Sequence, residues 1–268
     1  QDVCLCAVLI LAGSASWWEV RQPQFLSSPV KSVCHYDAEA EFLAQDPCIY
    51  FEGKVEVAVI GNSHAVEIAY ALAESLKQYD IALAHFSMSG CNHNYKIVET
   101  HPEQDWQLIC REWHARVLER LKRLRPRHVV LSYRNDNIVD SPEHRDSLIS
   151  FIEELLAEDI EVTYVSQAPL LDTHIKRLLR QTGASITADA SLIGASLNAW
   201  KERYVGENQL RDELPKTVIV IDPSEHFCDM SHCFAVLEGR SLYTDDDHIS
   251  LDGAKIIADL LVERISAR

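Results

Sequence analysis

Five short runs of aliphatic and β-branched residues alternate with longer helical segments along most of the chain. The runs cover residues 55–60, 81–86, 128–132, 161–166 and 217–221. Each run is almost continuously apolar, which is typical of parallel strands that are covered on both faces. The alternation therefore predicts an α/β fold, a three-layer α/β/α sandwich built around a five-stranded parallel sheet.

The segments between these runs have helical periodicity. They cover residues 64–78, 105–124, 142–158 and a long region, 173–204, that is broken near Gly183. A last helix is expected after Ser250, a suitable N-cap, with Asp252 in its first turn. Its apolar face consists of Ala254, Ile257, Ala258, Leu261 and Ile265. Sheets of this kind bind ligands at the carboxyl ends of their strands, so the residues that follow each strand are the ones to inspect.

The N-terminal segment does not fit the alternation. Residues 3–13 form an uncharged apolar run, followed by Trp17 and Trp18. This run is shorter than the roughly 20 residues that cross a bilayer. A buried segment and a signal-peptide core are alternatives, but the positive charge that begins a signal peptide is missing. We favour the end of a truncated transmembrane helix, with the tryptophans at the headgroups.

The predicted organisation therefore has three parts. Residues 1–13 are the end of the truncated transmembrane helix, 14–53 an extension or linker, and 54–268 the catalytic domain. Because the chain begins with Gln1 rather than methionine, we expect it to be a piece of a longer protein.

Six of the eight cysteines lie in neighbouring pairs. The pairs are Cys34 with Cys48, Cys91 with Cys110, and Cys228 with Cys233. Clustered cysteines in even number suit an oxidising compartment and predict three local disulfides, although spacing alone does not fix the connectivity. Zinc is an alternative because residues 226–233 contain two histidines and two cysteines. Zinc motifs usually separate their ligand pairs by a longer segment, so no metal is predicted.

The charge of the chain excludes one class of partner. Acidic residues outnumber Lys and Arg by 41 to 25, which gives a formal net charge of -16. Nucleic-acid binding depends on neutralising phosphates with Lys and Arg, so no nucleic-acid partner is expected.

A candidate nucleophile follows the first predicted strand. The strand runs into Gly61-Asn62-Ser63-His64, and helical periodicity begins at once. Gly61 allows a tight turn, and Ser63 falls at a helix N-terminus, where free backbone N–H groups favour a developing oxyanion. Taken alone, Ser63 is explained equally well as an N-cap.

The candidate base lies near the other end of the chain, in residues 243–250, just before the last helix. A general-base histidine needs an acceptor on its second ring nitrogen, and Asp245 precedes His248 by three residues. Asp246 and Asp247 are alternative acceptors, although adjacent residues tend to point away. A solvated acidic loop is the simpler interpretation. We nevertheless predict a catalytic triad of Ser63, His248 and Asp245.

Two further strand ends offer oxyanion donors. Gly90 follows the second strand, and Asn135 follows the third. The backbone N–H groups of Ser63 and Gly90, with the Asn135 amide, are the expected oxyanion hole. Singly, Gly90 and Asn135 are also ordinary turn residues.

Together these residues resemble the SGNH hydrolase superfamily. The blocks are Gly61-Asn62-Ser63, Gly90, residues 133–136, and Asp245 with His248, in that order. Asn62 replaces the usual Asp, and Tyr133 replaces the usual Gly, which weakens the Asn135 assignment. The sequence Gly-Asn-Ser-His, the late cysteine pair and the Asp-Asp-Asp-His-x-Ser segment are similar to SGNH domains fused to membrane acyltransferase-3 domains.

The resemblance implies an O-acyltransferase that modifies bacterial surface glycans such as lipopolysaccharide through a Ser63 acyl-enzyme. Most members of this family transfer acetyl groups, so an O-acetyltransferase is implied. It implies no cofactor, an acyl donor (acetyl in most members) as co-substrate, a surface glycan as acceptor and an acyltransferase-3 domain in the same chain. The implied location is the periplasmic face of the inner membrane. The alternatives are a carbohydrate esterase, which uses water as acceptor, and a glycan-binding domain without activity.

Three further histidines and two tryptophans are expected to pack in the structure and not to take part in catalysis. His64 competes with His248 for the role of base, but its ring is expected to point away along the new helix and to serve packing. His85 and His128 lie on predicted strands and are expected in the core. Trp106 and Trp113 are expected to pack one helix.

Overall fold

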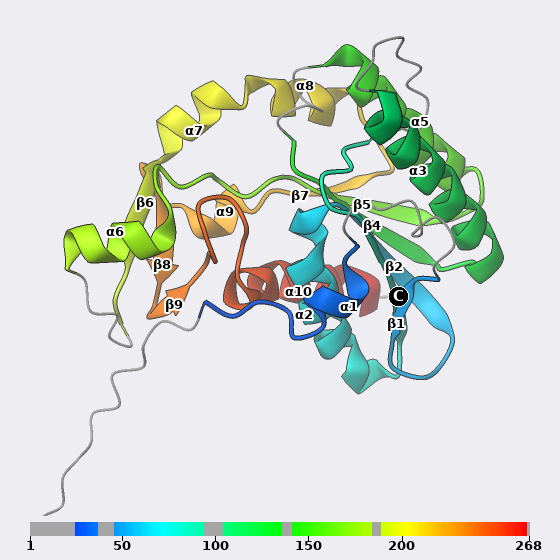
Figure 1. The fold of residues 1–268 in the computed structure, drawn as a ribbon, viewed down its shortest axis with the longest axis horizontal. Helices are drawn as coiled ribbons and strands as arrows, with labels where there is room; N and C mark the ends of the chain where they lie inside the picture. The colour runs from blue at the N-terminus through cyan, green and yellow to red at the C-terminus, as the bar shows by residue number, and fades with distance from the viewer. Residues whose placement is uncertain (1–24, 37–45, 94–103, 136–140, 184–188, 267–268) are drawn as a thin grey trace, which may run out of the picture.

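A computed structural model describes residues 25–36, 46–93, 104–135, 141–183 and 189–266 (Figure 1). The apolar run and the paired tryptophans that we interpreted as a membrane helix lie outside these residues. Within the described ranges, no helix combines enough length with enough apolar character to cross a membrane. The three-part organisation predicted above stays a prediction.

The centre of the molecule is a six-stranded sheet in the order β1-β3-β2-β4-β5-β7 (Figure 1). Its strands are β1 (Cys48–Tyr50), β2 (Val55–Gly61), β3 (Ala82–Ser87), β4 (His128–Ser132), β5 (Glu161–Val165) and β7 (Ile219–Ile221). The last five are parallel and match the five predicted strands, which confirms the fold class. β1 pairs antiparallel with β3 and was not predicted, because three residues carry no detectable periodicity.

Helices cover both faces of this sheet. They are α2 (Val66–Leu76) and α10 (Leu251–Ser266) on one face, and α3 (Gln104–Leu124), α5 (Pro142–Leu156) and α8 (Val205–Glu213) on the other. Alternate side chains of β2 separate the two cores: Val57 and Val59 pack toward α2 and α10, and Ala58 and Ile60 toward α3 and α5. The α10 N-terminus is as predicted, since the Ser250 hydroxyl accepts the backbone N–H of Gly253 at 3.2 Å.

The long helix predicted over 173–204 is wrong in its centre. Helix α6 (Ile175–Thr182) ends at Gly183, which has a φ of 61°. Strand β6 (Leu192–Ser196) then precedes α7 (Leu197–Arg203). With β8 (His232–Leu237) and β9 (Arg240–Ser241), β6 forms a separate antiparallel sheet. Whether so short an apolar run forms a strand depends on pairing with another strand and not on its own periodicity.

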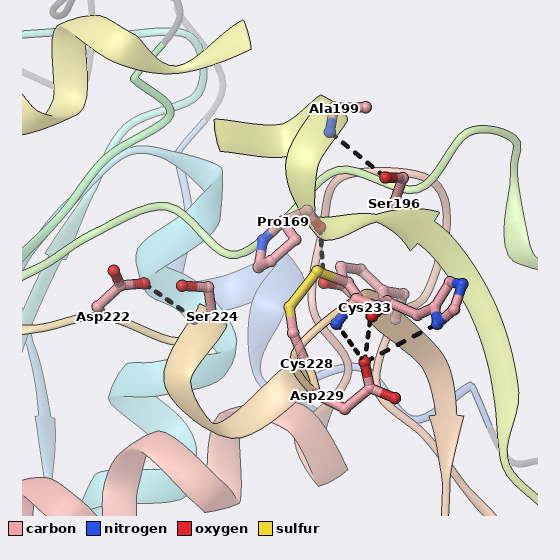
Figure 2. The surroundings of a disulfide bond; sticks show 11 residues. Pro169, Ser196, Ala199, Asp222, Ser224, Cys228, Asp229 and Cys233 are labelled. Carbon is pink, nitrogen blue, oxygen red and sulfur yellow. Dashed lines mark hydrogen bonds and ion pairs between the residues drawn. A yellow bond between two sulfur atoms is a disulfide. The ribbon is translucent and has the colours of Figure 1, made fainter. Parts of the chain in front are cut away.

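The three predicted disulfides are present: Cys34–Cys48, Cys91–Cys110 and Cys228–Cys233. The first joins α1 (Lys31–Cys34) to β1, so part of the segment predicted as an extension is tied to the main sheet. The third joins the end of α9 (Ser224–Phe227) to β8 (Figure 2). The zinc alternative for residues 226–233 is thereby excluded, because both sulfur atoms are bonded to each other.

A close approach at the end of β2 positions the residues that follow it. Gly61 lies so near β4 that a Cβ atom would overlap the carbonyl oxygen of Ser132 and approach the Ala65 Cβ to 2.7 Å. The short helix η2 (Ser63–Ala65) starts immediately afterwards. Only glycine therefore lets this turn lie flat against the sheet.

Gly61→Ala is expected to lower the free energy of unfolding by about 1–3 kcal/mol, because the added methyl group must displace backbone. Urea unfolding followed by circular dichroism measures it. Gly183→Asn is the control, since asparagine tolerates a positive φ and nothing lies within 4 Å of a Cβ there. Equal stability of both variants and the unmodified protein would contradict the account of this turn.

Candidate active site

Asn62 organises the turn that carries Ser63. Its side chain is 2% exposed. The Oδ1 atom accepts the backbone N–H groups of His64 and Arg134, each at 3.1 Å. The Nδ2 atom donates to Asn92 Oδ1 at 3.1 Å. One buried amide thus joins the ends of β2 and β4 to the loop after β3, and an aspartate at this position would lack the donor to Asn92.

Ser63, His248 and Asp245 form one hydrogen-bonded line. His248 Nε2 lies 2.8 Å from Ser63 Oγ, although the two residues are 185 positions apart. His248 Nδ1 lies 2.9 Å from Asp245 Oδ2. A neutral ring that donates from Nδ1 to this carboxylate leaves a lone pair on Nε2 facing the serine hydroxyl. A serine nucleophile and an oriented general base require this same geometry.

Asp245 also shapes its own loop. Its Oδ1 atom accepts the backbone N–H groups of Asp247 and His248 at 3.0 and 2.7 Å. The backbone N–H of Ile175 donates to the Asp245 carbonyl oxygen at 3.1 Å. The same carboxylate therefore holds both the loop backbone and the imidazole ring.

Asp247 is a second carboxylate at the ring, so the expectation that it points away is wrong. Its Oδ1 atom lies 2.7 Å from His248 Nδ1. Its Oδ2 atom lies 3.1 Å from Arg134 Nη1 and 3.9 Å from His64 Nε2. The reason is the tight turn formed on Asp245, which brings the side chain of residue 247 back toward the ring. Sequence spacing alone does not reveal this geometry.

The two carboxylates determine the charge of His248. Burial lowers the pKa of this ring, but the hydrogen bond to Asp245 and the charges of both aspartates outweigh burial and raise its pKa to about 9. Burial likewise raises the pKa of Asp245 and Asp247, but their contacts with His248 outweigh it and lower both pKa values. His248 is therefore charged at neutral pH and becomes a proton acceptor as the pH rises.

His64 packs against this group. Its ring stacks on His248 with the ring centroids 4.5 Å apart, so the expected packing role is confirmed but the expectation that the ring points away from the site is wrong. Burial, together with the charge of His248, lowers the pKa of His64 to about 3. A neutral ring thus covers the charged one.

The predicted oxyanion donors have different surroundings. Gly90 has a φ of 65° in the loop that Asn92 anchors to Asn62. Asn135 is fully buried, and its Nδ2 atom donates to Tyr164 Oη and Glu207 Oε2, both at 2.6 Å. Both amide hydrogens of Asn135 are therefore occupied, and its expected role as an oxyanion donor is not supported. Its partner Glu207 lies on α8, a helix that the sequence did not predict.

Residues 33–263 match the family model described as "SGNH domain (fused to AT3 domains)". This match covers most of the chain. The chain belongs to this family.

The fold of this SGNH domain is similar to that of known structures. The periplasmic domain of a lipopolysaccharide acetyltransferase from Salmonella ser. Paratyphi A has a TM-score of 0.62 at 13% identity, over 87% of this chain and 91% of that one. A putative acylhydrolase from Bacteroides fragilis NCTC 9343 has a TM-score of 0.47 at 13% identity, over 85% and 94% of the two chains. No curated protein sequence matches the chain.

The two histidines and two tryptophans that were expected to pack in the core do so. His85 is buried on β3 and bonds to Tyr50 Oη at 3.1 Å, and His128 is buried on β4 and bonds to Thr163 Oγ1 at 2.9 Å. Both tryptophans lie on α3: Trp113 is buried in the core between α3 and the sheet, and Trp106 is partly buried against that core.

The acidic loop also gathers side chains of the kind that bind metals. In the described part of the chain, two such groups have ligand atoms within 4.8 Å: His64, Asp247 and His248, and residues 245–247. Both contain Asp247, whose oxygens already face the His248 ring and the Arg134 guanidinium. The protein's own cations thus balance the charge of this carboxylate.

Removing the Asp247 charge is expected to lower the pKa of His248 from about 9 toward the ordinary 6.5, because one of two stabilising carboxylates is lost. NMR titration of the imidazole in Asp247→Asn and in the unmodified protein measures the shift. Asp259→Asn on the exposed face of α10 is the control and should leave the titration unchanged. A His248 pKa that is the same in Asp247→Asn would contradict the two-carboxylate account.

Proposed function

We propose that this SGNH domain is an O-acyltransferase, most simply an O-acetyltransferase, that moves an acyl group to a hydroxyl of a bacterial surface glycan. The observation that carries the proposal is the line from Ser63 Oγ through His248 to Asp245, with contacts of 2.8 and 2.9 Å. The family's fusion to AT3 domains, and the fold shared with the periplasmic domain of a lipopolysaccharide acetyltransferase, support the reaction and the acceptor class.

In the first half-reaction, Ser63 attacks the carbonyl carbon of an acyl donor. Neutral His248 takes the hydroxyl proton at Nε2, and both aspartates stabilise the imidazolium that results. The tetrahedral oxyanion forms at the N-terminus of η2, where the backbone N–H groups of Ser63 and Gly90 are the proposed donors. Each such donor contributes about 3 kcal/mol to transition-state stabilisation. The leaving group of the acyl donor then departs with the proton from His248.

In the second half-reaction, a glycan hydroxyl attacks the acyl group on Ser63. His248 now takes the proton of that hydroxyl and returns a proton to the Ser63 oxygen as it leaves. The products are an O-acylated glycan and free enzyme, and no step needs a cofactor. We place the domain on the periplasmic face of the inner membrane, where an acyltransferase-3 domain of the same chain supplies acyl groups.

Hydrolysis is the competing outcome. His248 is 22% and Asp245 32% exposed, so water reaches the proposed triad. The same chemistry with water as acceptor gives an esterase. The fate of the acyl-enzyme in the presence of glycan separates the two.

Ser63→Ala is expected to reduce enzyme acylation by p-nitrophenyl acetate by about 10³-fold or more, because the nucleophilic oxygen is lost. Mass spectrometry of the intact protein measures acylation. Ser196→Ala, which removes the N-cap of α7, is the matched control and should react normally. Full acylation of Ser63→Ala would disprove the assignment.

The acyl-enzyme is expected to transfer its acyl group to glycan faster than to water. Preacylated protein is mixed with delipidated surface polysaccharide or with buffer, and mass spectrometry follows both the protein and the glycan. Transferase activity predicts faster deacylation with added glycan and an acylated glycan product. Deacylation at the same rate without a glycan product would identify an esterase.

A further inference from the structure

A polar cavity lies on the same edge of the sheet as Ser63. It has a volume of about 420 Å³ and is lined by residues that follow β5 and β7, by residues of α7, α8 and α9, and by Tyr204 between α7 and α8. Figure 1 shows where these elements lie. This volume is in the range of small-ligand sites. The proposed triad does not include any of its lining residues.

Gln167 gives the wall of this cavity an unsatisfied donor. The side chain is 4% exposed, and its Oε1 atom accepts the backbone N–H of Asn135 at 2.8 Å. Its Nε2 atom is buried, and no described residue accepts a hydrogen bond from it. Buried donors normally have partners, and a small shift of this side chain toward the cavity would let a ligand oxygen accept from Nε2.

Glu207 lies beside Gln167 in the same wall. One of its oxygens accepts the amide of Asn135. Burial raises the pKa of this carboxyl. The wall of the cavity therefore contains an amide and a carboxyl group, a combination that forms hydrogen bonds with hydroxyl groups.

Aromatic rings form another part of the wall. The rings of Trp200 and Tyr204 are in contact, with centroids 3.8 Å apart and planes tilted by 34°, and Trp200 is partly exposed. Aromatic faces favour apolar C–H surfaces, and the neighbouring polar groups favour hydroxyls. A sugar residue offers both kinds of surface.

The charge of the cavity argues against an anionic ligand. Its lining contains three carboxyl groups, those of Glu207, Asp222 and Glu225, and two cations, Lys201 and Arg211. Arg211 is already paired with Asp222 at 2.9 Å. With no excess of positive charge, a phosphate or carboxylate ligand is disfavoured.

Hydrogen bonds connect the cavity to the turn that holds Ser63. The strands β2, β4 and β5 are neighbours, so the ends of β2 and β5 lie about 10 Å apart, two strand spacings. The backbone N–H of Arg134 bonds to Asn62 next to Ser63, and that of Asn135 bonds to Gln167 in the cavity wall. A glycan that reaches Ser63 with one residue can therefore place another in the cavity.

We infer that this cavity is a subsite for a neutral sugar residue of the acceptor glycan, next to the residue that receives the acyl group. The inference rests on the proposed function, because it names where the acceptor is held. Asn135, whose amide hydrogens are bonded to Tyr164 and Glu207, connects the edge that carries Ser63 to the subsite through its backbone hydrogen bond to Gln167.

Two variants test the subsite without changing the proposed triad. Gln167→Glu keeps the acceptor for the Asn135 N–H but replaces the unsatisfied donor with an acceptor. Ser224→Phe fills the cavity from the start of α9 (Figure 2). Gln78→Glu is the matched control, because its amide donates to the Ser75 carbonyl oxygen at the surface.

Binding is measured by saturation-transfer NMR in a Ser63→Ala background, so that no reaction occurs. The probes are the methyl α-glycosides of glucose, galactose, mannose and rhamnose, with methyl glucuronoside and inorganic phosphate as anionic comparisons. At least one neutral glycoside is expected to bind. Its affinity should fall about tenfold in both cavity variants, the effect of one lost hydrogen bond to a buried group, and stay constant in Gln78→Glu.

Acylation by p-nitrophenyl acetate separates a failure of the subsite from a failure of the proposed function. Both cavity variants, with Ser63 intact, should acylate at the rate of the unmodified protein. Normal acylation without glycoside binding, equal binding in the cavity variants, or tighter binding of the anions would overturn the subsite alone. Failure of the unmodified protein to acylate would overturn the proposed function, whereas the NMR result would still decide what the cavity binds.

Discussion

The hydrogen bond between Ser63 and His248 depends on how firmly two distant segments are held at one edge of the sheet. The segment before α10 is a closed turn: Tyr243 pairs with Ile249, and the Thr244 N–H bonds to the His248 carbonyl oxygen at 2.9 Å. The loop after β5 fixes it from outside, because the Leu171 N–H donates to Asp246 and the Pro169 carbonyl accepts the Tyr243 hydroxyl. The imidazole is therefore positioned before any substrate binds, which is the condition for an efficient base.

The charges around His248 suit the proposed reaction. Two aspartates stabilise the imidazolium, and Arg134 pairs with Asp247 on the side away from the ring. A strongly stabilised imidazolium makes proton transfer from the serine easier but leaves less neutral base at pH 7. His64 adds a neutral ring stacked on the charged one, so water is excluded from that face. In the proposed mechanism, this lowers the fraction of active enzyme at neutral pH but stabilises the transition state.

Much of this structure follows from local sequence. The five parallel strands were predictable because each is a continuous apolar run, and the disulfides because their cysteines are close in sequence. The location of the proposed triad followed from two motifs that the topology brings to one edge. What failed were features set by distant partners: β6 depends on β8, and the amide of Asn135 is bound by Glu207 from an unpredicted helix. Asp247 was misjudged because its direction depends on a turn made by side-chain hydrogen bonds.

The central claim is that Ser63 is a nucleophile activated by His248. Labelling with a serine-directed fluorophosphonate, followed by peptide mapping, tests it most directly. The account predicts a single label on Ser63 that forms faster as the pH rises toward 9, where His248 loses its proton, and that is nearly abolished in His248→Ala. A label on another serine, or equal labelling of Ser63 without His248, would contradict it.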